Sequence, residues 1–151
     1  MRAVVQRVNS GSVTIDGEVR ASIGKGFVIL LGIEHSDGFE EIEKIWSKIE
    51  KLRIFEDSGG KTGADLAAVD GSVIIVSQFT LYADCKKGNR PSFMKAAAPD
   101  HAEATYNAFV ERAQQSQIPV QSGVFGAYMT VSIENDGPFT IILDTDELMP
   151  R

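Results

Sequence analysis

Two apolar runs limit the fold of this 151-residue chain more than any other feature. Residues 26–32 read GFVILLG and residues 72–77 read SVIIVS. Neither run alternates with polar residues, so each predicts a strand that is buried on both of its faces. The first run is bounded by glycines and is expected at the centre of a sheet, which other elements must then cover.

Two amphipathic helices are predicted to supply this cover. The first has apolar residues at helical spacing: Ile42, Ile45, Trp46, Ile49 and Leu52. Asp37 and Glu40 stand three residues apart in front of this stretch and predict a capping box. The second helix follows Pro99 and Asp100 and ends before Pro119. Its apolar face comprises Ala102, Tyr106, Phe109, Val110 and Ala113.

Short strands are expected at both ends of the chain. Asp16-Gly17 stands between two alternating runs, which is the pattern of a β-hairpin. Residues 130–134 and 139–143 also alternate, and they predict two half-buried strands. Their connector, residues 135–138, reads NDGP and is typical of a turn, because all four residue types favour turns.

This order of elements predicts an α/β fold, a layered β-sheet domain with two main helices packed on the sheet. No repeat or linker interrupts residues 1–151, so a single domain is expected. Residues 57–72, DSGGKTGADLAAVDGS, have no period and predict a surface loop. Asp57, Asp65 and Asp70 are expected to favour turns there rather than to act in acid–base chemistry.

Charge and composition exclude several classes of protein. The formal net charge of −6 argues against broad binding to nucleic acid, which needs clustered cations. Residues 84–95, DCKKGNRPSFMK, are a local exception, and we name them the basic loop. Its cations are Lys86, Lys87, Arg90 and Lys95. The basic loop is either a solvated surface loop or a local contact for phosphate.

The sequence predicts neither a metal site nor a cofactor site. One cysteine and two separated histidines form no zinc pattern. His35 and His101 are expected in surface or capping positions, and Cys85 has no partner histidine in view. No apolar run is long enough for a membrane span or a signal peptide, so a cytoplasmic protein without a membrane contact is expected.

The end of the second buried strand carries polar side chains. Ser77, Gln78 and Thr80 stand where the apolar run finishes, and strand ends of α/β sheets often line a site. The alternative is that these side chains only satisfy local backbone groups.

Two stretches carry a resemblance to a known family. Residues 77–83, SQFTLYA, and residues 135–140, NDGPFT, resemble the two signature motifs of the D-aminoacyl-tRNA deacylases. The stretches MRAVVQRV, RPSF and GVFGAYM are similar to that family in the same order, over nearly the whole chain. The resemblance implies a family-specific deacylase fold and an editing enzyme that hydrolyses the ester between a D-amino acid and the 3′ end of tRNA. It also implies removal of glycine mischarged on tRNA-Ala.

The resemblance further implies a homodimer whose subunits complete each other's sites. The Gly137-Pro138 peptide would be cis, and each subunit would insert it into the partner's active site. Its carbonyl groups would then exclude an L side chain, while a D residue or glycine fits. Arg7 matches a family arginine that orients this element.

The remaining site residues also follow from the resemblance. Catalytic positions would be Gln78, Phe79 and Thr80, together with Gly137 and Pro138. The terminal adenosine would lie near Ser77, and its adenine would contact the segment with Phe125 and Met129. The acceptor end would meet Lys86, Lys87 and Arg90. Phe139 and Tyr128 depart from the usual family pattern, which has a valine and an acid there.

Three interpretations of the chemistry remain open. In the preferred one, backbone amides around Phe79 and Thr80 stabilise an oxyanion, and the 2′-hydroxyl of the terminal ribose assists attack by water. In the second, Thr80 is a nucleophile, although no adjacent base is in view. In the third, the chain is a non-catalytic dimer of the same fold that binds nucleic-acid ends.

Overall fold

The sheet is centred on strands β3 (Gly26–Gly32) and β6 (Ser72–Ser77), which pair in parallel in the computed structural model. The structure describes residues 1–150. Six of the seven β3 residues and the four inner β6 residues are buried. The prediction of two strands buried on both faces is therefore confirmed, and the reason is that both faces of the sheet carry a core.

A long first strand organises the rest of the sheet. β1 (Arg2–Ile15) pairs with β3 through its first half and with β2 (Glu18–Ile23) through its second half. β8 (Thr130–Asp144) lies along the other edge of β1, and β7 (Val120–Ser122) extends the sheet beside β6. The β1–β2 hairpin turns at Asp16 and Gly17, both with positive φ, as the sequence predicts.

The expectation of two strands joined by a turn at residues 135–138 is wrong. Residues 130–144 form one continuous strand, β8, that stays paired with β1. Asn135 pairs with Val8 and Thr140 with Gln6, so four residues of β8 stand opposite the single residue Arg7. These residues, 136–139, form a wide bulge, which we name the Gly-Pro bulge.

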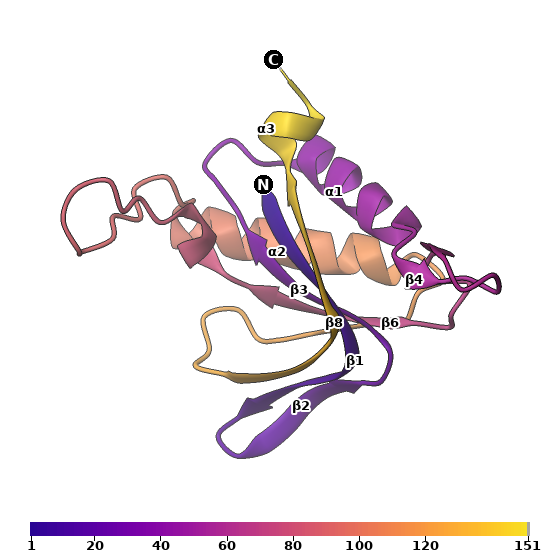
Figure 1. Cartoon of the computed structure of the whole chain (residues 1–151). Coiled ribbons are helices and arrows are strands. Elements are labelled where there is room, and N and C mark those ends of the chain that lie inside the picture. Colours follow the sequence, from indigo (N-terminus) through magenta and orange to yellow (C-terminus); the bar gives the residue numbers. More distant parts are fainter. Residues whose placement is uncertain (151) are drawn as a thin grey trace.

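Two helices cover one face of the sheet, as predicted (Figure 1). They are α1 (Phe39–Lys51) and α2 (Pro99–Gln114), and the rings of Trp46 and Phe109 meet edge to face between them. On the other face, the β1–β2 hairpin folds over β3 and β6 and encloses a second, smaller core. The result is the predicted layered α/β fold, extended by a sheet that closes partly on itself.

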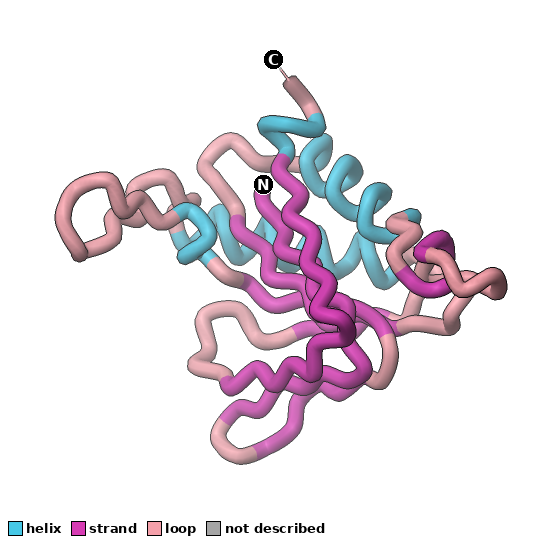
Figure 2. Tube along the Cα trace, in the orientation of Figure 1, coloured by secondary structure: helices cyan, strands magenta, loops and turns pink. Residues whose placement is uncertain are grey.

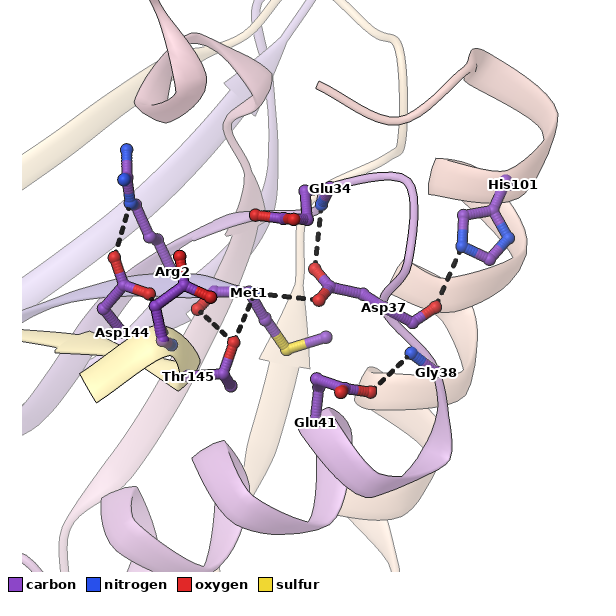
Figure 3. A network of polar contacts seen from close by, with 10 residues as sticks. Met1, Arg2, Glu34, Asp37, Gly38, Glu41, His101, Asp144 and Thr145 are labelled. Atoms are coloured by element: carbon purple, nitrogen blue, oxygen red, sulfur yellow. Dashed lines mark hydrogen bonds and ion pairs between the residues drawn. The ribbon is translucent and has the colours of Figure 1, made fainter. Parts of the chain in front are cut away.

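The capping prediction for α1 is shifted by one residue. Gly38 is the capping residue, and the Glu41 carboxylate accepts a hydrogen bond of 2.9 Å from its N–H. Asp37 is instead buried, where it forms a 2.9 Å ion pair with the Met1 ammonium (Figure 3). The Asp37 carboxylate therefore pairs with a buried charge and does not cap the helix as the sequence pattern predicted.

Five short elements were not predicted, and β7 is one of them. A small hairpin pairs β4 (Phe55–Glu56), which precedes the expected surface loop, with β5 (Thr62–Ala64), which lies within it. A 3-10 turn, η1 (Phe79–Tyr82), follows β6, and a one-turn helix, α3 (Thr145–Leu148), follows β8. None of the helices within residues 1–150 is both long enough and apolar enough to span a membrane.

Candidate active site

An apolar pocket of about 730 Å³ opens at the end of β6. Three predicted site residues, Ser77, Gln78 and Phe79, line it from this strand end. Two more, Phe125 and Met129, line it from the segment between β7 and β8. The structure therefore brings together five of the predicted site residues, from two segments that are far apart in the sequence.

The η1 turn reaches the pocket through its first residue, Phe79, whereas Thr80 lies outside the pocket lining. Its entry is fixed by a 2.8 Å hydrogen bond from the Gln78 N–H to the Leu31 carbonyl, at the end of β3. Phe79 and Thr80 are the first residues of the turn, where backbone N–H groups have no acceptor within the turn itself. The Thr80 hydroxyl accepts a hydrogen bond from the Gln78 side-chain amide, which is not a base.

Helix α2 supports the floor of the pocket. Phe125 packs against the Tyr106 ring, with 5.9 Å between ring centroids. The Tyr106 hydroxyl donates a 2.7 Å hydrogen bond to the Ile75 carbonyl in β6. Burial raises the pKa of Tyr106 to about 12, so its hydroxyl stays a neutral donor at physiological pH. Met129 lies against Gly123, where a Cβ atom would come within 2.7 Å of its sulfur.

The roof of the pocket consists of residues that sequence reasoning missed. Phe93 and Met94, at the end of the basic loop, line the pocket, and the Phe93 ring meets that of Phe79 at 5.0 Å. His35 Nε2 lies 2.8 Å from the Met94 carbonyl and ties this segment to the loop after β3. Tyr128 stands on the rim and is 96% exposed. Phe93 and Tyr128 lie in the stretches RPSF and GVFGAYM that carry the family resemblance, but the sequence assigned neither of them a role in the site.

Gly137 and Pro138 do not line this pocket. They lie in the Gly-Pro bulge, where both are exposed and the peptide bond between them is cis. Arg7 holds the bulge within the same chain: its Nε donates to the Asp136 carbonyl at 3.1 Å, and its guanidinium carbon lies 4.6 Å from the centroid of the Phe139 ring. One chain alone therefore does not bring the two motifs together.

Arg7 is itself held firmly. Its Nη1 donates a 2.6 Å hydrogen bond to the Ile54 carbonyl, and its Nε lies 3.3 Å from the Asp136 carboxylate. The side chain is 15% exposed, so these contacts are partly shielded from water. Arg7 thus links the bulge to the segment after α1.

The basic loop projects away from the body of the protein (Figure 2). Its residues Phe93 and Met94 line the pocket. Lys86, Lys87 and Arg90 are exposed on the loop and lie outside the pocket lining. Its base is closed by two backbone hydrogen bonds between Asp84 and Ser92, of 2.7 and 2.9 Å. The three cations are therefore presented to solvent on a closed loop.

The other candidates take up local roles. His35 and His101 lie at the surface, and the His101 ring contacts the Asp37 carbonyl at 2.9 Å. Asp57 accepts hydrogen bonds from two backbone N–H groups of its own turn, as expected. Cys85 is exposed. Across residues 1–150, His, Cys, Asp and Glu side chains form no cluster that could hold a metal ion.

Fold and pocket together define an α/β protein with an apolar site at a strand end and a second motif held on its surface. A family model described as D-Tyr-tRNA(Tyr) deacylase matches residues 4–144. The D-aminoacyl-tRNA deacylase of Bifidobacterium adolescentis is 51% identical over 157 residues, covering 98% of this chain and 99% of that protein. The one of Thermus aquaticus is also 51% identical, with 97% of each chain covered. The chain therefore belongs to the D-aminoacyl-tRNA deacylase family.

Solved structures share the fold of this chain. The protein titled c-Myc DNA Unwinding Element Binding Protein matches with a TM-score of 0.90 and 44% identity, over 95% of this chain and 98% of that one. A probable eukaryotic D-amino acid tRNA deacylase matches with a TM-score of 0.75. At 18% identity, over 94% of this chain and 97% of that one, it supports the fold alone.

Proposed function

We propose that this chain edits aminoacyl-tRNA by hydrolysing the ester of D-aminoacyl-tRNA and of glycyl-tRNA mischarged on tRNA-Ala, while it spares L-aminoacyl-tRNA. As a member of the deacylase family, the chain is a hydrolase of ester bonds. The observation that carries the proposal is the convergence of residues 77–79 with Phe125 and Met129 on one pocket. The proposed place of action is the cytoplasm.

The proposed reaction relies on backbone groups. The terminal adenosine of the tRNA enters the apolar pocket, with its adenine beside Phe125 and Met129. Water attacks the ester carbonyl carbon, assisted by the ribose 2′-hydroxyl. The backbone N–H groups of Phe79 and Thr80 donate hydrogen bonds to the carbonyl oxygen and stabilise its negative charge. The ribose 3′-oxygen then leaves and takes a proton, which gives free tRNA and a free amino acid.

Several contacts favour this mechanism over a Thr80 nucleophile. The Thr80 hydroxyl accepts its hydrogen bond from an amide N–H, which cannot remove a proton. The two histidines are the other candidate bases, and their rings contact the backbone carbonyls of Met94 and Asp37. An activated ester needs less assistance than an amide bond, so a site without a side-chain base suffices.

Rejection of L substrates is assigned to the partner subunit. Gly137 and Pro138 are exposed and lie outside their own chain's pocket, and Arg7 braces the bulge that carries them. We infer that a second copy inserts this bulge into the pocket, where its carbonyls meet the substrate's α-carbon. Met129, Val131 and Ile133 are half-buried against the second core of their own chain, and Met129 and Val131 also line the pocket that the bulge would enter.

One assay tests the proposal. D-, L- and glycyl-esters of the same tRNA are incubated with the protein, and ester loss is followed over time. Hydrolysis of the D- and glycyl-esters with the L-ester spared is the expected result, and equal rates on the D- and L-esters would refute it. Light scattering at the assay concentration should give a dimer, and full activity from a monomer would exclude the cross-subunit part.

A second candidate is binding of nucleic-acid ends without catalysis. One structural relative is titled as a DNA-element binding protein, and the basic loop presents Lys86, Lys87 and Arg90 to solvent. In both functions these cations are proposed to contact phosphates, so reversing their charge should weaken tRNA binding and flatten its salt dependence. Binding of tRNA without any loss of the D-ester would favour the second candidate.

A further inference from the structure

We propose that Arg2 is a positioning residue for the η1 turn, whose first two amides stabilise the oxyanion in the proposed reaction. This inference rests on the proposed function, because it assigns a role in that reaction. Arg2 does not line the pocket. It contacts the η1 turn at Leu81, in the second half of the turn, and not from the side of the substrate.

The Arg2 guanidinium connects three parts of the chain. Its Nη1 donates a 3.0 Å hydrogen bond to the Leu81 carbonyl, and its central carbon lies 4.6 Å from the centroid of the Tyr82 ring. Its Nε donates a 2.7 Å hydrogen bond to the Asp144 carboxylate at the end of β8 (Figure 3). The planar fork of guanidinium donors suits an arrangement in which two acceptors are bonded and a ring is covered at once.

Asp144 fixes the direction of this arginine. It stands opposite Arg2 in the β1–β8 ladder and also caps α3 by accepting a 2.9 Å hydrogen bond from the Asp146 N–H. Burial favours the neutral form of this carboxyl, but the hydrogen bonds from Arg2 and Asp146 outweigh burial and hold the pKa of Asp144 below its ordinary value. The pair is therefore charged throughout the neutral range.

The turn is seated on the end of β3. A Cβ atom at Gly32 would come within 3.0 Å of Leu81, 3.2 Å of the Gln78 carbonyl and 3.3 Å of Tyr82, so the turn packs directly on the strand's backbone. Tyr82 is buried, and within the described chain its hydroxyl has no hydrogen-bond partner. Its ring, and not its hydroxyl, is what the guanidinium uses.

A four-residue turn has too few internal hydrogen bonds to hold its own orientation. The η1 turn has one bond at its entry, from the Gln78 N–H to Leu31, and one at its far end, from Arg2 to the Leu81 carbonyl. Loss of the second bond leaves the far end of the turn held by its packing on β3, without a side-chain hydrogen bond to fix its orientation. A displacement of about 1 Å at such a group costs on the order of a hundredfold in rate.

Arg2→Met tests the inference, because methionine keeps an apolar stem but has no donor. Arg20→Met is the matched control, since Arg20 is a β2 arginine whose nearest acid, Glu18, is 3.9 Å away. Two experiments are done on each full chain. The first measures amide hydrogen exchange over residues 78–83 and in β3. The second measures the single-turnover rate on D-aminoacyl-tRNA and the enzyme concentration that gives half of the maximum rate. We expect Arg2→Met to speed exchange over 78–83 but not in β3.

We also expect Arg2→Met to lower the single-turnover rate by at least about tenfold, with half-saturation within about twofold of wild type, because Arg2 does not line the pocket. Arg20→Met should change neither quantity. Unchanged exchange over 78–83 overturns the inference, and so does faster exchange with a wild-type rate. If wild type itself spares the D-ester, the proposed function fails while the exchange data still decide whether Arg2 holds the turn.

Discussion

Gly137→Ala is the sharpest test of the Gly-Pro bulge. Gly137 has φ of +121°, a region that L side chains rarely adopt, and an added Cβ would lie 2.9 Å from Arg7 Nη2 and 3.3 Å from the Phe139 N–H nitrogen. The first gap is roughly 0.5 Å shorter than ordinary van der Waals contact. Arg7 cannot yield freely, because two hydrogen bonds and the Phe139 ring hold it.

The expected cost is of order 1–3 kcal/mol of backbone strain, and the bulge must also move by a large fraction of an ångström to relieve the contact. A shift of about 1 Å costs on the order of a hundredfold in rate. Single-turnover assays on D-, L- and glycyl-esters of one tRNA should therefore show lost D activity rather than gained L activity.

Gly17→Ala is the matched control for Gly137→Ala. Gly17 has φ of +78° with nothing within 4 Å of the added atom, so it carries the backbone cost alone. Wild-type rate and selectivity in Gly137→Ala would refute the reasoning, and so would an equal loss of rate in Gly17→Ala.

Three further changes have defined outcomes. Thr80→Ala should keep substantial single-turnover activity, because its backbone N–H remains, whereas loss of a nucleophile would cost several orders of magnitude. Asp37→Ala should lower the free energy of unfolding by about 3–5 kcal/mol in denaturant titrations, because it leaves the Met1 ammonium buried without its ion-pair partner. A loss below about 1 kcal/mol would contradict this prediction. Asp144→Asn should lower the free energy of unfolding at pH 7. The difference in free energy of unfolding between the variant and wild type should shrink as pH falls below about 4. The reason is that a carboxylate whose folded pKa is lowered stabilises the fold only while it is charged. A difference that does not shrink as pH falls would contradict the assignment.

Local signals were sufficient where a segment's burial follows from its own residues. The runs at 26–32 and 72–77 have no polar residue between their first and last positions to place on an exposed face, which favours central strands. Asp16-Gly17 needs positive φ at both positions and is found with it. The apolar faces of both helices follow from their spacing in the same way.

Local signals failed where a distant residue decides the outcome. NDGP has the preferences of a turn, and only pairing of Asn135 with Val8 and Thr140 with Gln6 keeps the chain in one strand. Asp37 has the position of a capping residue, but it pairs with an ammonium that lies 36 positions away. The roof of the pocket was not predicted for the same reason, because Phe93 joins the site through its contact with Phe79, a residue of another segment.

A site that works through backbone groups explains why the sequence carries no acid–base signature. In the proposed reaction the oxyanion meets amides of Phe79 and Thr80, and the chiral screen consists of carbonyls in the Gly-Pro bulge. Side chains then matter through where they hold the backbone, as Arg7 does for the bulge and Arg2 does for the η1 turn. Mutations at these two arginines should therefore be more harmful than mutation of Thr80, although Thr80 lies in a signature motif and carries a hydroxyl that could react.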